Sequence, residues 1–84
     1  MGVSDRELDD RIRALLNARA ANSSICPSDV AHAIAPDEWR PLMESVRQAA
    51  RRLVEAGEVE ITQKGAVVDP ESVRGPIRIR RPRA

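Results

Sequence analysis

Hydrophobic residues recur at helical spacing in three stretches of this chain. The first stripe consists of Leu8, Ile12, Leu15 and Leu16. Ser4 and Glu7 form a capping box just before it, which marks the start of a helix. The spacing predicts helices over residues 5–20, 27–35 and 38–56, each with one apolar face turned toward a common core.

Prolines set the boundaries of the second and third helices. Pro27 suits the first turn of a helix, where its missing N–H is no loss. Pro36 ends the second helix, because the residue before a proline avoids helical geometry. Pro41 fits poorly inside a helix that begins at residue 38. The alternative is a tight turn over residues 37–40 with Pro41 in the first helical position.

After Gly57 the pattern changes from helical spacing to alternation. Residues 58–68 alternate around a turn, which predicts a β-hairpin. A two-residue loop pairs Ile61 with Val68 and a three-residue loop pairs it with Val67, and the sequence leaves both open. Residues 77–80 alternate again and predict a final strand at the edge of the sheet.

The order of these elements is helix, short extended segment at residues 23–25, helix, turn, helix and hairpin. This order is typical of a winged helix-turn-helix, a mainly α fold with a β-hairpin as its wing. We expect a winged-helix domain over residues 1–73 and a basic C-terminal strand and tail over residues 74–84. The extended segment is free to pair with a later strand.

Three parts of the chain resemble a small bacterial family known only as a domain of unknown function. They are Cys-Pro-Ser-Asp-Val-Ala at 26–31, Glu-Trp-Arg-Pro-Leu-Met-Glu at 38–44, and Val-Val-Asp-Pro at 67–70 with Arg-Gly-Pro-Ile-Arg at 74–78. The resemblance covers roughly residues 5–80. It implies a winged-helix fold and no activity, and a winged helix by itself serves DNA readers and protein-interaction modules alike.

Composition excludes several classes of protein. One Cys and one His among 84 residues cannot form a closed zinc site or an intramolecular disulfide. No apolar run approaches the ~20 residues that span a bilayer, and the acidic N-terminus lacks a secretory signal, so we expect a cytoplasmic protein without a membrane partner. The glycines are isolated and no catalytic group has a partner in a pocket, so we expect neither enzyme activity nor a cofactor.

Charge is divided unevenly along the chain. All 13 acidic residues precede residue 74, whereas every charged residue of 74–84 is basic. These are Arg74, Arg78, Arg80, Arg81 and Arg83. The asymmetry predicts a tail that binds nucleic acid or another polyanion. The alternative is that Arg78 and Arg80 protect an exposed edge strand from pairing.

The third helix is the predicted recognition helix, and duplex DNA is the predicted partner because one Trp provides no stacking platform for single strands. Its candidate contacts are Arg40, Arg47, Gln48, Arg51 and Arg52, with Lys64 at the wing tip. The tail adds Arg78, Arg80, Arg81 and Arg83. The competing interpretation is a solvated surface helix with i,i+4 ion pairs from Arg40 to Glu44 and from Arg51 to Glu55.

Two other functions stay open from the sequence. In the first, the domain is a protein-interaction module. An acidic partner protein docks on the edge of the hairpin, and its carboxylates pair with the arginines of the tail. In a thiol sensor, Cys26 at a helix start is the reactive group. Its apolar neighbours Ile25 and Pro27 instead favour a buried, inert thiol. We also expect Trp39 to be largely buried between the second and third helices.

Overall fold

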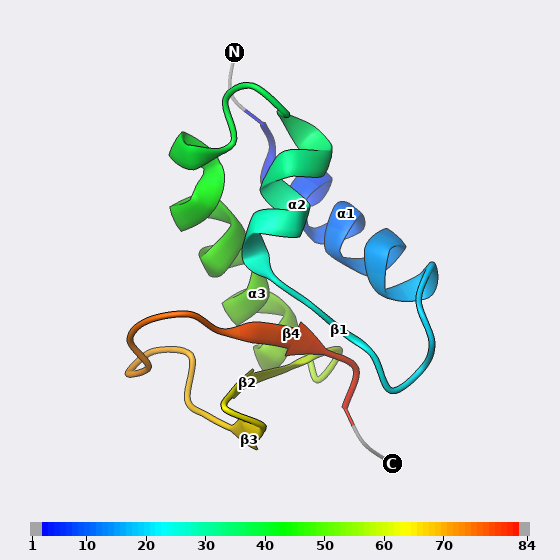
Figure 1. Ribbon diagram of the computed structural model, residues 1–84, viewed down its shortest axis with the longest axis vertical. Coiled ribbons are helices and arrows are strands. Elements are labelled where there is room, and N and C mark those ends of the chain that lie inside the picture. The colour runs from blue at the N-terminus through cyan, green and yellow to red at the C-terminus, as the bar shows by residue number, and fades with distance from the viewer. Residues whose placement is uncertain (1–2, 83–84) are drawn as a thin grey trace.

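The computed structural model describes residues 3–82. Three α-helices lie to one side of a small antiparallel sheet (Figure 1). The elements are α1 Asp5–Asn17, β1 Ser24–Ile25, α2 Pro27–Ile34, the 3-10 turn η1 Arg40–Leu42, α3 Met43–Glu55, β2 Glu60–Gln63, β3 Ala66–Val67 and β4 Arg78–Arg80. This confirms the predicted class of three helices with a β-hairpin, in an arrangement compatible with a winged helix.

The predicted helices form with shorter bounds. The Ser4 hydroxyl accepts the N–H of Glu7 at 3.1 Å, as the capping box predicts. α1 ends at Asn17 and not at residue 20, because residues 17–22 are exposed and contribute nothing to the core. α3 begins at Met43, five residues later than the main prediction, so the alternative with a turn before Pro41 is the closer one.

The order of strands in the sheet is β1-β4-β2-β3, which makes β4 an interior strand. The prediction of an edge strand here is wrong, and so is the reading that its arginines protect an edge. In Figure 1 the chain after β3 forms a wide loop and returns on the opposite side of β2. There Ile79 pairs with Ile25 and Ile61, and all three are buried. Residues 78–80 therefore belong to the folded domain.

The hairpin uses the two-residue loop. Gln63 pairs with Ala66, and the loop residues Lys64 and Gly65 have φ angles of 53° and 84°. Both angles lie in the left-handed region, as a type I′ turn requires. The backbone N–H of Val68 donates to the carbonyl of Ile61, in agreement with that register.

The core lies between the helices and the inner face of the sheet. Its largest fully buried side chains are Leu8, Ile12, Ile25, Val30, Val46, Leu53, Ile61 and Ile79. Trp39 is only partly buried, so the prediction of a buried anchor is wrong. Its ring stacks on the His32 ring, with 4.4 Å between the ring centroids, and the Arg40 guanidinium carbon lies 4.4 Å from the Trp39 ring centroid. Because α3 begins after η1, Trp39 lies before the core-facing stripe of the helix.

Candidate anion-binding site

Most of the arginines expected to contact DNA from the tail are bound within the domain. Arg80 lies opposite Glu60 and donates to its carboxylate from Nε at 3.1 Å and from Nη2 at 3.0 Å. The two side chains are only 16% and 25% exposed. Arg83 lies outside the described residues.

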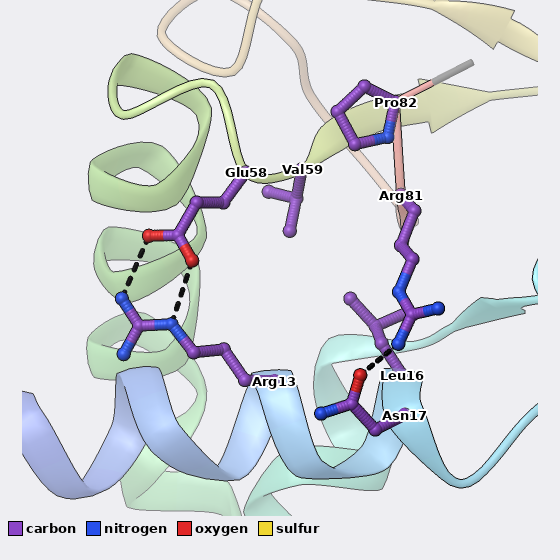
Figure 2. A pocket seen from close by; sticks show the side chains of 7 residues that line it. All are labelled: Arg13, Leu16, Asn17, Glu58, Val59, Arg81 and Pro82. Carbon is purple, nitrogen blue, oxygen red and sulfur yellow. Dashed lines mark hydrogen bonds and ion pairs between the residues drawn. The ribbon is translucent and has the colours of Figure 1, made fainter. Parts of the chain in front are cut away.

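Arg81 lies at a cavity of about 360 Å³ beside α1 (Figure 2). Its guanidinium donates to the Asn17 side-chain oxygen. Across the cavity, Arg13 donates to both carboxylate oxygens of Glu58, at 2.9 Å and 2.8 Å. These hydrogen bonds lower the pKa of Glu58 and raise the pKa of Arg13. Glu58 lines this cavity with its negative charge and already occupies the Arg13 guanidinium. The cavity is therefore a poor site for an anion.

Arg52 is turned away from the outward face of α3. It donates from Nη2 to Asp9 at 2.8 Å, and this contact with α1 raises the pKa of Arg52. The pair fixes α3 against α1. The structure therefore places Arg52 with a structural partner and apart from the other candidate contacts.

The expected ion pairs along α3 do not form. Among residues 3–82, neither Arg40 with Glu44 nor Arg51 with Glu55 makes a salt bridge. Gln48 instead donates to Glu44 at 3.5 Å, and both side chains are exposed. The helix face is therefore exposed to solvent, as the competing interpretation expects, but without the expected ion pairs, and Arg51 keeps its charge exposed.

Arg47 joins α3 to the loop between β3 and β4. Both of its terminal nitrogens lie 3.4 Å from the carbonyl oxygen of Gly75. Gln63 holds the same loop from the hairpin side by donating to the carbonyls of Arg74 and Pro76, at 2.5 Å and 3.1 Å. Four basic residues belong to the segments that these contacts join. They are Arg47, Arg74 and Lys64, with Arg51 one turn farther along α3.

Arg78 is held only by neutral groups. Its Nε donates to the Ser24 hydroxyl at 2.6 Å and its Nη2 to the Ser24 carbonyl at 3.1 Å. Its Nη1 lies 3.1 Å from the sulfur of Cys26. Within the described residues no carboxylate forms an ion pair with Arg78. The guanidinium is therefore fixed in place with its charge uncompensated.

A second cavity, of about 340 Å³, opens beside Arg78. It is lined by Cys26, Thr62, Gln63, Lys64, Pro76, Ile77 and Arg78. Two cations and no carboxylate face it. Cys26 is half-buried here, which contradicts the expectation of a buried thiol. The cavity is thus a concave, positively charged site in the described part of the chain.

Comparison with known families agrees with the resemblance seen in the sequence. The profile described as "Protein of unknown function (DUF3253)" matches residues 5–82. The chain belongs to the DUF3253 family. No curated protein matches the sequence. The family description assigns no chemistry to any position, so the geometry of this DUF3253 domain is the basis for its function.

The Arg78 cavity is the site that sequence reasoning missed. The sequence places Thr62 in the hairpin and Lys64 at its turn, but it does not reveal that Arg78 is the partner opposite Thr62. Only the pairing of β4 with β2 brings these side chains together. In residues 3–82 we find neither a cluster of three metal-binding side chains nor a helix long and apolar enough to cross a bilayer.

Proposed function

We propose that this DUF3253 protein is a non-enzymatic winged-helix protein of the bacterial cytoplasm that binds duplex DNA or another polyanion. The observation that carries the proposal is the contact of Arg47 with the Gly75 carbonyl. It joins the recognition helix to the loop between β3 and β4, in which Arg74 precedes Gly75, and Arg51 is one helical turn from Arg47 on the same helix. Winged helices place these two elements on a groove and on the adjacent phosphate backbone.

The proposed contacts differ from those the sequence favoured. Arg80 and Arg52 are held by carboxylates of the domain itself and drop out of the interface. Arg47, Arg51, Arg74 and Lys64 form no ion pair within residues 3–82 and remain for phosphates. Arg40 lies on the Trp39 ring, from which its terminal nitrogens can still reach a phosphate.

Charge limits the strength of this interaction. The chain has 14 Lys and Arg against 13 Asp and Glu, and Arg83 is outside the described residues, so the described part is electrically neutral. Glu44 and Glu55 lie on α3 near the proposed contacts. We therefore expect about three phosphate contacts, a slope of log affinity against log salt of roughly −3, and weak sequence preference.

Fluorescence anisotropy with a labelled duplex tests the proposal. Arg51→Gln combined with Arg74→Gln should flatten the salt slope by about two units. Arg11→Gln is a matched control, because Arg11 is exposed on α1 and forms no ion pair in residues 3–82. It should leave the slope nearly unchanged. Absence of duplex binding at low salt, where the electrostatic attraction is largest, would overturn the proposal.

A specific observation supports a second candidate, a protein-interaction module. Val67 is 58% exposed, the only exposed large apolar side chain among the described residues. It lies on β3, which is an edge of the sheet. An extended segment of a partner could add to this edge, with acidic side chains on Arg74 and Lys64. Val67→Lys would disrupt such a surface without touching α3, so its effects separate the two functions.

A further inference from the structure

The cavity beside Arg78 is built on the pairing of two strands. Thr62 on β2 lies directly opposite Arg78 on β4. Lys64 in the hairpin turn and Pro76 just before β4 line the same cavity. The volume of about 340 Å³ is within the size range of small-molecule sites.

Arg78 presents a free pair of donors. A guanidinium has five N–H groups, and the contacts to Ser24 and Cys26 use three of them. One N–H remains on each terminal nitrogen, and either can donate to a carboxylate or phosphate. Two residues along the same strand, Arg80 has its charge met by Glu60. Arg78 has no such partner in the described chain.

Thr62 supplies a second polar group. It is 5% exposed, the only buried polar residue among those described, and it lines the cavity. Its hydroxyl makes no hydrogen bond within residues 3–82, although no fully buried side-chain polar atom there lacks a partner. The hydroxyl therefore retains some exposure, and Thr62 lines the cavity, which makes the hydroxyl available to a molecule bound there. It is a donor in reach of a bound oxyanion.

We propose that this cavity binds a small organic anion. Its carboxylate or phosphate group lies against Arg78 and Lys64 and accepts from Thr62. Its apolar part lies on Ile77 and Pro76, which form the uncharged wall. This site shares Lys64 with the proposed DNA surface, but Arg78 and Thr62 are not part of that surface, so the small-anion site does not depend on DNA binding.

Cys26 is a reporter inside the site, and its alkylation provides the test. Iodoacetate carries a carboxylate and iodoacetamide does not, while both react with the same thiolate. The ratio of their two rates therefore cancels the fraction of thiolate and reports attraction of the carboxylate. We expect the ratio to be ~5-fold higher in the native protein than in the urea-unfolded protein, because two cations face the cavity.

Variants assign this ratio to its residues. Arg78→Gln and Lys64→Asn should each lower the native ratio by about twofold or more, with folding checked by circular dichroism. Arg11→Gln removes the same charge elsewhere and should leave the ratio unchanged. Thr62→Val keeps the shape and the charge of the site. It should therefore weaken the binding of a phosphate, which the competition below measures. In the Arg78→Gln background, it should leave the ratio of alkylation rates unchanged.

A second arm uses phenyl phosphate, inorganic phosphate and phenol as competitors of iodoacetamide. Phenyl phosphate should protect Cys26 most, inorganic phosphate less and phenol least, because only the first offers both an anion and an apolar body. A short DNA duplex forms the last arm. Protection by the duplex alone would assign the cavity to a DNA phosphate and overturn the small-anion site. Equal native and unfolded ratios would overturn it as well.

Discussion

Arg80 on β4 donates two hydrogen bonds to a single carboxylate oxygen of Glu60, the residue directly opposite it on β2. Glu60 follows a helix and Arg80 is close to the end of the chain, so the sheet alone makes them neighbours. In the sequence Arg80 belongs to a basic tail with no acidic neighbour, but in the structure its ion pair with Glu60 connects the two central strands. The charge available to an outside partner is correspondingly smaller.

Removing one member of this pair should destabilise the domain. Because Arg80 and Glu60 are mostly buried, we expect Glu60→Gln to cost about 1–2 kcal/mol in the free energy of unfolding. Urea unfolding followed by circular dichroism measures this. Arg80→Gln should cost a similar amount, and the double variant should cost less than the sum. Strict additivity would show that the two side chains do not interact in solution.

The partial burial of Trp39 sets a modest cost for its removal. We expect Trp39→Ala to lower the free energy of unfolding by about 1–3 kcal/mol, below the 3–5 kcal/mol typical of a fully buried aromatic ring. Stacking against His32 contributes about 0.5–1.5 kcal/mol of this. The chain has one Trp and no Phe or Tyr, so the variant has no intrinsic fluorescence with which to follow unfolding. Circular dichroism is the probe instead. A loss above 4 kcal/mol would contradict an exposed stack.

The Arg13 and Glu58 pair makes stability depend on pH in one direction. Hydrogen bonding to Arg13 lowers the pKa of Glu58 in the folded state from its ordinary value of 4.5. The pair therefore stabilises the fold above pH 4.5, and this stabilisation is lost as pH falls through the folded pKa. The difference between wild type and Glu58→Gln in urea midpoint should be constant near neutral pH and shrink in acid. Glu55→Gln removes an exposed carboxylate that forms no ion pair among residues 3–82, and it should show no such narrowing.

The left-handed turn at Lys64 predicts a stabilising substitution. Its φ angle of 53° is unfavourable for a lysine and is tolerated well by asparagine. Lys64→Asn should raise the free energy of unfolding by roughly 0.5 kcal/mol, which thermal unfolding detects as a higher midpoint. Lys64→Val provides the contrast, since a β-branched residue at this φ angle should destabilise the hairpin. Equal midpoints for the two variants would argue against the two-residue turn.

The sequence was sufficient to place the helices and the hairpin, although not all of their bounds. The capping box at Ser4, the turn before Pro41 and the change of period after Gly57 are local signals, and the structure confirms an element at each. They are readable because helix and strand spacing act over a few residues. The length of the hairpin loop stayed open between two and three residues. A shift of the strand register by one residue leaves the local conformational preferences of the loop residues unchanged.

Tertiary structure alone decided where β4 lies and therefore which charges are free. A three-residue strand carries no signal of its neighbours, so its interior position depends on whether Ile79 packs better between Ile25 and Ile61 than at an edge. That choice pairs Arg80 with Glu60, leaves Arg78 facing Thr62 and creates the cavity. Contacts between residues about 20 to 50 positions apart are set by burial of the whole core, which no local pattern encodes.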